Sequence, residues 1–289
     1  MANTFVLELE GKTAARLVTF ESTGVNMQVV TGSQPFNRLS KVVTGTLGEI
    51  KIKFGADATR PLLDWMVASA YGNYGKKSGA VIVLDSHSKV LHRIEFGDAQ
   101  VTSFTLPALD RSSKGPAYFS ASFRPAILKH TTGGDTLTAG STVLPAQKIW
   151  NTSNFRFQID GLDTESAAIS KVSSFSLNTA VKQMHLGDRR LPDVEPTGTT
   201  YSNVVIVVPM SKASGILSWF DQAVNRGTVE ASEKTASLEF LGPADKMTYF
   251  TAEFTEVGII STSTSKVSGD SNRDLIAELY CNSIRLKYL

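Results

Sequence analysis

The stretch Arg60–Tyr71, RPLLDWMVASAY, decides the fold, because a second version of it occurs at Gly215–Val224, GILSWFDQAV. In both versions the apolar residues follow the i, i+3, i+4 spacing of one helix face. These anchors are Leu62, Trp65 and Met66 in the first version and Ile216, Trp219 and Phe220 in the second. Each version therefore predicts a short helix packed on a core.

Signals for the helix ends flank both versions. Residues that can cap a helix N-terminus precede them: Asp57 or Thr59 before the first, and Ser211 or Ser214 before the second. Gly72 and Gly227 lie just past the ends, where a left-handed residue is expected. We expect no further helix, since the rest of the chain is typical of strands.

Composition sets the class of protein. The chain has 289 residues, 42% of them hydrophobic, with a net charge of +2. Its mean hydropathy of −0.04 argues against a membrane protein. The lone Cys281 excludes an internal disulfide framework and, with no secretory signal in the first residues, predicts assembly in a reducing cytoplasm. The small net charge does not favour nucleic acid as a main partner.

The strands also come in two matching series. Each half opens with an alternating strand and a second strand, followed by a polar stretch that we expect to be a loop, and then an apolar strand before the helix. In the first half these are Asn3–Glu10, Ala15–Thr19, Thr31–Gly48 and Glu49–Phe54. In the second half they are Asn154–Asp160, Ala168–Val172, Met184–Thr200 and Asn203–Val208.

The match continues past the helices. A predicted hairpin and a closing strand follow each one: Ala80–Leu84, Leu91–Phe96 and Ala117–Phe123, against Ser237–Leu241, Met247–Phe250 and Leu275–Cys281. The separation in sequence between Trp65 and Phe96 equals that between Trp219 and Phe250. Because such spacings recur in the same order, the chain is predicted to contain a duplicated domain.

We therefore predict a mainly β fold of two tandem antiparallel β-barrel or sandwich domains, each with one flanking helix. Domain 1 covers residues 1–130, a Thr, Gly and Ser-rich linker covers 131–150, and domain 2 covers 151–289. Residues 1–150 hold 16 Lys+Arg and 11 Asp+Glu, a net of +5, which leaves −3 for residues 151–289. This asymmetry either favours packing of unlike halves or reflects chance variation.

Residues suited to catalysis are sparse, so we expect no enzyme, no cofactor and no metal site. The four histidines, at 87, 92, 130 and 185, fall in separate predicted elements, and one cysteine cannot make a Cys-based zinc site. The stretch Gly72–Ser78, GNYGKKS, lacks the first glycine and the Ser or Thr of a phosphate-binding loop. It also follows a helix, whereas such a loop must precede one.

The second half resembles the inner tube proteins of contractile phage tails and contractile injection systems, a family that includes the haemolysin-coregulated protein of type VI secretion. The matching residues are Phe155–Leu162, Lys171–Phe175, Gly187, Leu191-Pro192, Tyr201–Val205 and Leu217–Trp219. The first half matches more loosely, through Phe5–Gly11, Gly48–Phe54, Leu63–Trp65 and Ala80–Phe96. The chain departs from the family in its duplication, since the usual tube subunit has one such domain.

The resemblance implies barrels that form six-fold rings, which stack into a hollow tail tube that conducts DNA or effectors. It also implies ring contacts in the two polar stretches, for which we choose Phe36, Arg38, Arg189, Arg190 and Leu191. With two barrels in a chain, three copies could close a pseudo-hexameric ring; the rival is a hexamer in which each domain forms its own ring.

The implied partners are further copies of the chain and the sheath, baseplate or tail-terminator proteins, with cargo passing through the lumen without sequence-specific binding and no membrane insertion. The implied location is a virion tail or injection-system particle assembled in the bacterial cytoplasm. The alternative function is a baseplate hub or adaptor ring that joins tube to spike. The kind of particle stays open between a phage, a tailocin and an injection system.

Overall fold

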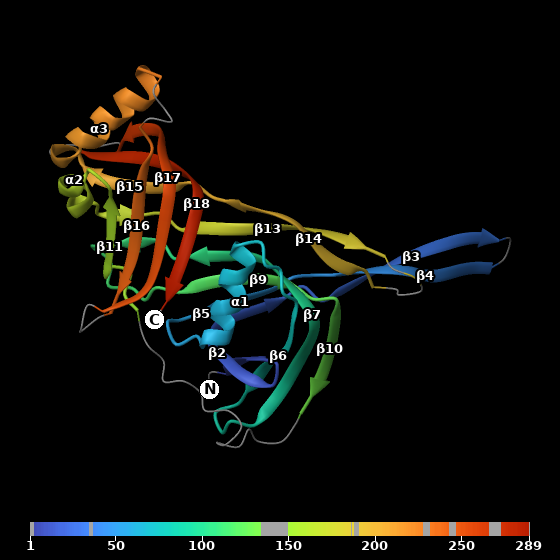
Figure 1. The fold of residues 1–289 in the computed structure, drawn as a ribbon. Helices are drawn as coiled ribbons and strands as arrows, with labels where there is room; N and C mark the ends of the chain where they lie inside the picture. The colour runs from blue at the N-terminus through green and yellow to red at the C-terminus, as the bar shows by residue number, and fades with distance from the viewer. Residues whose placement is uncertain are drawn as a thin grey trace. The chain divides into compact units, whose positions relative to one another are not determined.

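The computed structural model describes residues 3–34, 37–133, 150–185, 187, 191–227, 232–242, 247–265 and 273–288, and for 28–34 and 37–44 the backbone alone. The prediction of a mainly β fold is confirmed (Figure 1). Of the described residues, 61% lie in strands and 14% in helices. The strands form a closed six-stranded barrel, a curled half-barrel sheet and a separate two-stranded ribbon.

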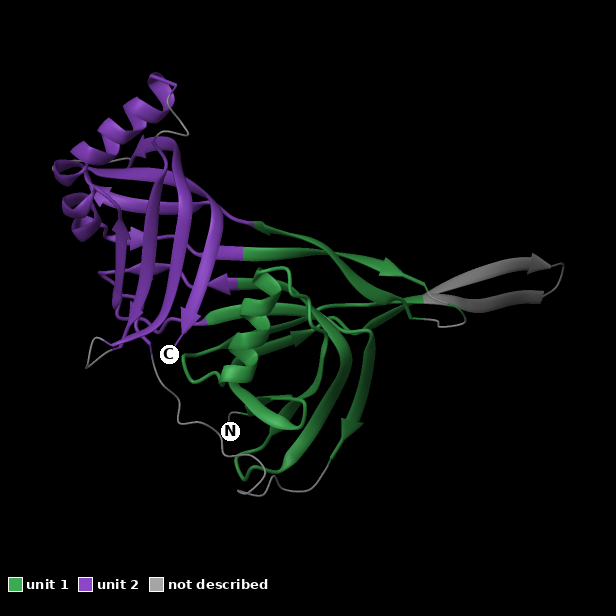
Figure 2. Ribbon diagram, viewed as in Figure 1, with its two compact units in different colours: residues 1–104, 119–148, 177–200 green, residues 105–118, 149–176, 201–289 purple. Residues whose placement is uncertain are grey.

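The chain divides into two compact units (Figure 2). Unit 1 holds residues 1–104, 119–148 and 177–200, and unit 2 holds residues 105–118, 149–176 and 201–289. Each unit thus takes one segment from the other half of the sequence. The boundaries predicted at residues 130 and 151 concern the sequence repeat, and they stay a prediction.

Unit 1 is built on the closed barrel, in which neighbouring strands run in the order β7-β6-β1-β2-β5-β9 and β9 returns to β7. Their bounds are β1 Thr4–Leu9, β2 Lys12–Ser22, β5 Ile50–Phe54, β6 Lys77–Leu84, β7 Val90–Leu106 and β9 Phe119–Arg124. Side chains alternate between core and surface: in β5, Ile50, Ile52 and Phe54 are buried while the two lysines between them are exposed.

Five more strands belong to unit 1: β3 Val25–Gln34, β4 Asn37–Leu47, β10 Ile127–Thr132, β13 Phe175–Met184 and β14 Asp193–Tyr201, the last two apart from their residues at the unit boundary. β10 pairs with β7, and the β13–β14 hairpin extends the same sheet from β7. β3 and β4 form the two-stranded ribbon.

Unit 2 is the curled half-barrel, with strand order β11-β16-β17-β18-β15-β12-β8. The bounds are β8 Leu109–Asp110, β11 Phe155–Ile159, β12 Lys171–Val172, β15 Val204–Pro209, β16 Lys234–Leu241, β17 Thr248–Thr264 and β18 Asp274–Tyr288. Its core is rich in aromatic rings: Phe175 and Phe254 meet edge to face at 5.4 Å, and Phe240 lies 4.6 Å from Trp150.

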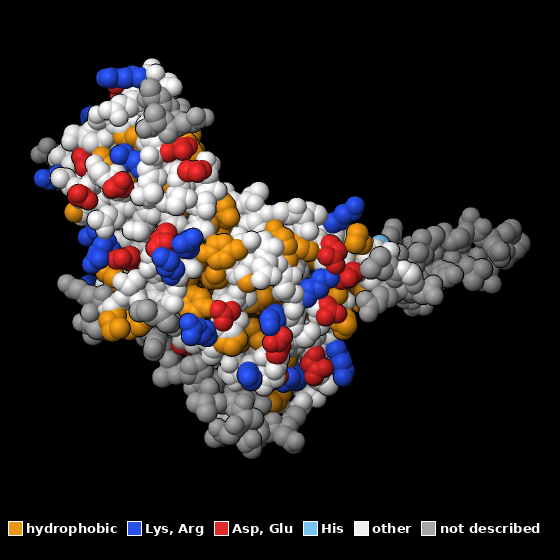
Figure 3. Space-filling view, viewed as in Figure 1, with side chains coloured by type: hydrophobic (Ala, Val, Ile, Leu, Met, Phe, Trp, Pro, Cys, Tyr) orange, Lys and Arg blue, Asp and Glu red, His pale blue; other side chains and the backbone are white. Residues whose placement is uncertain are grey.

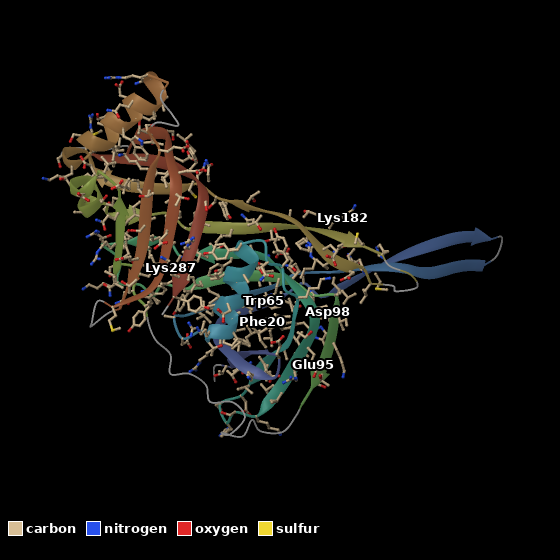
Figure 4. The ribbon with its side chains drawn as sticks, viewed as in Figure 1. Phe20, Trp65, Glu95, Asp98, Lys182 and Lys287 are labelled. Atoms are coloured by element: carbon tan, nitrogen blue, oxygen red, sulfur yellow. The ribbon has the colours of Figure 1, made fainter. Side chains whose placement is uncertain are left out.

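The first predicted helix is α1, Arg60–Ala70, which lies against the barrel of unit 1 (Figures 1 and 4). Trp65 is only 2% exposed, and its ring centroid lies 5.4 Å from that of Phe123 on β9. Its Nε1 donates a hydrogen bond of 2.7 Å to the carbonyl oxygen of Gly75. Gly72 is left-handed at φ 76°, but the Thr59 side chain makes no capping hydrogen bond.

The second predicted helix is α3, Ser214–Phe220, continued by a π-helical turn, Asp221–Asn225, and preceded by a 3-10 turn, Met210–Lys212. Neither Ser211 nor Ser214 caps it; instead the buried carboxylate of Glu165 accepts a 2.8 Å hydrogen bond from the Gly215 N–H. Trp219 mirrors Trp65, because it is 2% exposed and its Nε1 donates to the Ser232 carbonyl at 2.8 Å.

The expectation of only two helices was wrong, since Glu165 belongs to a third, α2, Asp163–Ala168. The strand predicted at Ala168–Val172 is correspondingly reduced to the two residues of β12. The alternation over this stretch misled because Ala and Ser fit either structure, whereas the acidic first turn of α2 favours a helix.

The two stretches predicted to be loops are largely strands. Thr31–Gly48 falls mostly in β3 and β4, and Met184–Thr200 contains most of β14. Polarity misled here, because backbone pairing can hold polar strands and Val and Thr favour extended backbone. Pro196 is tolerated because β14 is the end strand of its sheet.

Strand register also corrects the matching of the two halves. Asp98 in β7 and Glu256 in β17 are both left-handed, with φ 49° and 52° (Asp98 is labelled in Figure 4). Aligning these two residues also matches Phe96, which pairs with Gly79, to Phe254, which pairs with Ala236. Phe250 is thus not the counterpart of Phe96, and the equal spacing from the two tryptophans was a coincidence.

Candidate subunit interface

Unit 1 holds the β13–β14 hairpin by polar contacts from the turn that follows α1. Lys76 Nζ donates to Asp193 Oδ1 at 3.0 Å and to Glu195 Oε1 at 2.7 Å. The Tyr74 hydroxyl lies 3.0 Å from Thr199 Oγ1. Partial burial alone would lower the pKa of Lys76, but the hydrogen bonds to Glu195 and Asp193 outweigh it and raise this pKa. The turn therefore clamps the hairpin with a partly shielded ion-pair triad.

Unit 2 holds segment 105–118 in a similar way. β8 pairs with β12, so that Asp110 stands opposite Lys171, and their side chains form an ion pair of 3.0 Å. The Arg111 N–H donates to the Ser170 carbonyl at 2.9 Å. Hydrogen bonds from Ser112 and from Lys171 lower the pKa of Asp110 to about 2.

The two exchanged segments, residues 177–200 and 105–118, are held in the same way. Each compact unit is completed by strands that come from the other half of the sequence, and each segment is fixed by backbone pairing together with an ion pair. Backbone pairing supplies affinity at a sheet edge, while the ion pairs fix which segment is accepted. In both units a segment from the other half of the sequence is thus held at a sheet edge.

The predicted helix anchors lie as follows. Leu62, Trp65, Met66, Ile216 and Trp219 are buried, and Phe220 is half-buried. Burial gives these residues a packing role in their own units.

Most of the predicted ring contacts fall outside the description. Phe36, Arg189 and Arg190 lie outside the described residues, and Arg38 is described only by its backbone in β4. Leu191 is half-buried, and its Cδ2 lies 2.9 Å from the point where a Cβ on Gly45 of β4 would stand. Gly45 therefore leaves room for Leu191 beside the ribbon.

One histidine pair was missed from the sequence. His92 on β7 and His130 on β10 approach within 3.3 Å, Nε2 to Nδ1, because the two strands pair. Only the pairing of two strands far apart in sequence could have shown this. Among the described residues, no group of three or more His, Cys, Asp or Glu side chains could hold a metal ion.

A surface hollow of about 640 Å³ lies on unit 2. Its lining includes Arg111, whose guanidinium stands 5.3 Å from the Phe155 ring centroid, and Ser166, whose hydroxyl accepts from the Ile159 N–H at 2.9 Å. These side chains are occupied in packing the fold.

The described surface carries charges of both signs. On the face drawn in Figure 3, Lys and Arg side chains are interspersed with Asp and Glu. In the part of the chain that the structure describes, no helix has both the length and the apolar character needed to cross a membrane.

Comparisons with known proteins give weak structural likenesses. No protein-family model and no curated protein sequence matches the chain. Among solved structures, a chain of the anti-feeding prophage tube-terminating cap aligns with 50% of this chain and 95% of its own length, at 13% identity and a TM-score of 0.42.

A chain of the anti-feeding prophage baseplate aligns with 46% of this chain and 91% of its own length, at 14% identity and a TM-score of 0.39. Hcp1 from Flavobacterium johnsoniae aligns with 47% and 95%, at 14% identity and a TM-score of 0.29. These structures come from the group of proteins that the sequence resembles. At TM-scores below 0.5 they carry no inference about function.

Proposed function

We propose that the chain is a structural subunit that assembles into rings, and that the rings stack into a hollow tail tube or tube-like section of a contractile particle. The observation that carries this proposal is the exchange of strands: both units accept segments at their sheet edges, as subunits of a continuous ring of sheets must do. This role requires neither catalytic side chains nor a cofactor.

The proposed ring contains three chains. The two halves of the sequence share an order of two strands, a hairpin, a strand, a tryptophan helix and two further strands, with α2 as an addition in the second half, so a chain offers two successive places in a ring of six. Closed rotational symmetry is the usual outcome of such head-to-tail contacts. A closed barrel and a half-barrel would then alternate around the ring, which makes it pseudo-six-fold.

The tube and the adaptor-ring alternative differ in how rings stack. We expect the purified full chain to form rings that stack into open-ended tubes in negative-stain images. Single closed rings that never stack, at any protein concentration, would instead support the hub or adaptor ring. A chain that stays monomeric at concentrations of tens of micromolar would contradict both.

A further inference from the structure

The two repeats carry equivalent hairpins, which differ in whether they pair with a larger sheet. At the base of each the same backbone contact occurs: the Gly48 N–H donates to Gly24 O, and the Ser202 N–H donates to Ser176 O, both at 2.9 Å. β13–β14 adds to β7 of unit 1, whereas β3–β4 pairs, within the described residues, only with itself. A two-stranded ribbon is marginally stable alone, so this one needs a sheet to join.

The place where β13 joins β7 can be located by elimination. β6 pairs with β7 as far as Ala99, and β10 pairs with it as far as Gly97, so both edges of its first half are occupied. β13 therefore joins the second half of β7, beyond the left-handed Asp98.

The equivalent half of β17 lacks such a partner. β16 pairs with β17 only as far as Val257, and β18 covers the other edge up to Thr264. From Gly258 to Thr264, one edge of β17 is therefore unpaired within the described part of the chain. We call residues 258–264 the open edge.

Burial separates the two halves in the same way. In β7, Gln100, Val101 and Phe104 are at most 2% exposed. In the open edge, by contrast, Ile260 is 43% exposed, and Ser261, Ser263 and Thr264 are exposed as well. An unpaired strand edge with an exposed apolar side chain is a template for another strand.

We propose that the β3–β4 hairpin of one copy adds to the open edge of β17 in a second copy, just as β13–β14 adds to β7 within the chain. This inference rests on the proposed ring and names the junction that closes it. Each chain donates one hairpin and accepts one, so the contact propagates head to tail around the ring.

Charge supports this choice of partner. The clamp residue Lys76 immediately precedes β6, and the residue that immediately precedes β16 is Glu233. The tryptophan hydrogen bonds confirm this match, because their acceptors, Gly75 and Ser232, each come one residue earlier. Glu233 accepts a 2.6 Å hydrogen bond from the Tyr280 hydroxyl, and no described Lys or Arg forms an ion pair with it.

The hairpins show the complementary change. Counted along the sequence back from Ile50 of β5 and Val204 of β15, Lys41 of β4 corresponds to Glu195 of β14, with the β-bulge at Val43 lying between Lys41 and the base of its hairpin. Lys76 and Glu195 are thus replaced by residues of opposite sign, while the position of Asp193 is taken by Leu39, so the second junction keeps one Lys–Glu pair with the roles exchanged. Because the wrong hairpin would set like charges against each other, the pairs also enforce alternation of the two units.

A complementation experiment tests the proposal. In a donor-dead chain, Gln28–Thr44 is replaced by Asn-Gly, a tight hairpin turn. In an acceptor-dead chain, Ile260→Lys places a charge on the open edge. We expect the wild type to form rings, each variant alone to stay at the mass of its own single chain, and their mixture to stop at a pair that contains one chain of each variant.

Val224→Lys is the matched control for the acceptor, because Val224 is a similarly exposed apolar residue, 45%, that lies on the π-helical turn of unit 2 instead of the edge. This control should form rings as the wild type does. Circular dichroism of every variant checks that the fold is retained.

Charge exchange tests the pairing directly. Lys41→Glu and Glu233→Lys should each weaken self-association by about tenfold, and the two together should restore it to within about threefold of the wild type. Lys212→Glu, at an exposed lysine elsewhere on unit 2, controls for net charge. A double variant no better than the single variants overturns the proposed junction.

The failures are distinguishable. If the wild type forms rings and the donor-dead chain also does so by itself, the open-edge junction is refuted while the ring stands. If the wild type forms no ring under any condition, both the ring and its junction are refuted.

Discussion

Replacing Trp65 tests how α1 is anchored on unit 1. Trp65→Ala removes an indole that is 2% exposed and packed on Phe123, so the loss of buried area and the resulting cavity should cost about 3–5 kcal/mol. Trp65→Phe keeps an aromatic ring but loses the hydrogen bond to Gly75. Because Gly75 is exposed and water can reach its carbonyl, that loss should cost only about 0.5–1.5 kcal/mol.

Urea unfolding followed by circular dichroism measures both variants. With an m-value of about 2 kcal/mol/M, the midpoint for unit 1 should fall by about 1.5–2.5 M in Trp65→Ala and by less than about 1 M in Trp65→Phe. Trp219→Ala, at the equivalent position of unit 2, should lower the stability of that unit instead. An unchanged midpoint in Trp65→Ala, or equal shifts in the two Trp65 variants, would refute the packing account.

Three further predictions concern charge and reactivity. Asp110 has a folded-state pKa of about 2, below its ordinary 3.8, so its stabilising effect is present above pH 4 and is lost as the pH falls from about 4 to 2. Asp110→Asn should therefore flatten the dependence of stability on pH over that range in acid unfolding curves, and an unaltered curve would count against this role of Asp110. Burial raises the pKa of the Cys281 thiol to about 11, so at pH 8 the thiol should carry about a hundredfold less thiolate than a thiol of pKa 9. Its reaction with iodoacetamide, followed by mass spectrometry, should be correspondingly slow, and alkylation as fast as that of an exposed thiol would contradict the burial. Charge reversal at Arg189 and Arg190, which lie outside the described residues, should shorten stacked tubes while leaving rings intact, and tubes of normal length in electron micrographs would count against these two as stacking contacts.

Helix periodicity and strand alternation predicted much of the fold. The two tryptophan helices follow from the spacing of their apolar anchors, and β1, β5 and β11 follow from alternation over a half-buried face. These patterns are local, since burial of one face is encoded in neighbouring residues.

The exchanged segments could not be predicted in this way. In β14 only Val194 is a buried apolar residue, and strand pairing together with the ion pairs of Asp193 and Glu195 holds this strand in place. The partner of those carboxylates, Lys76, lies far away in the sequence, and no local pattern specifies so distant a contact. The internal repeat could reveal the charge reversal at Lys41 and Glu233 only after strand register had matched the two halves.

The mass of the smallest stable ring tests the central claim most directly. Native mass spectrometry or mass photometry of the full chain should give a ring with three times the 31.2 kDa mass of one chain, and averaged images should show six density lobes around it. A smallest closed ring of six chains, with twice the mass of the trimer, would contradict the pseudo-six-fold arrangement.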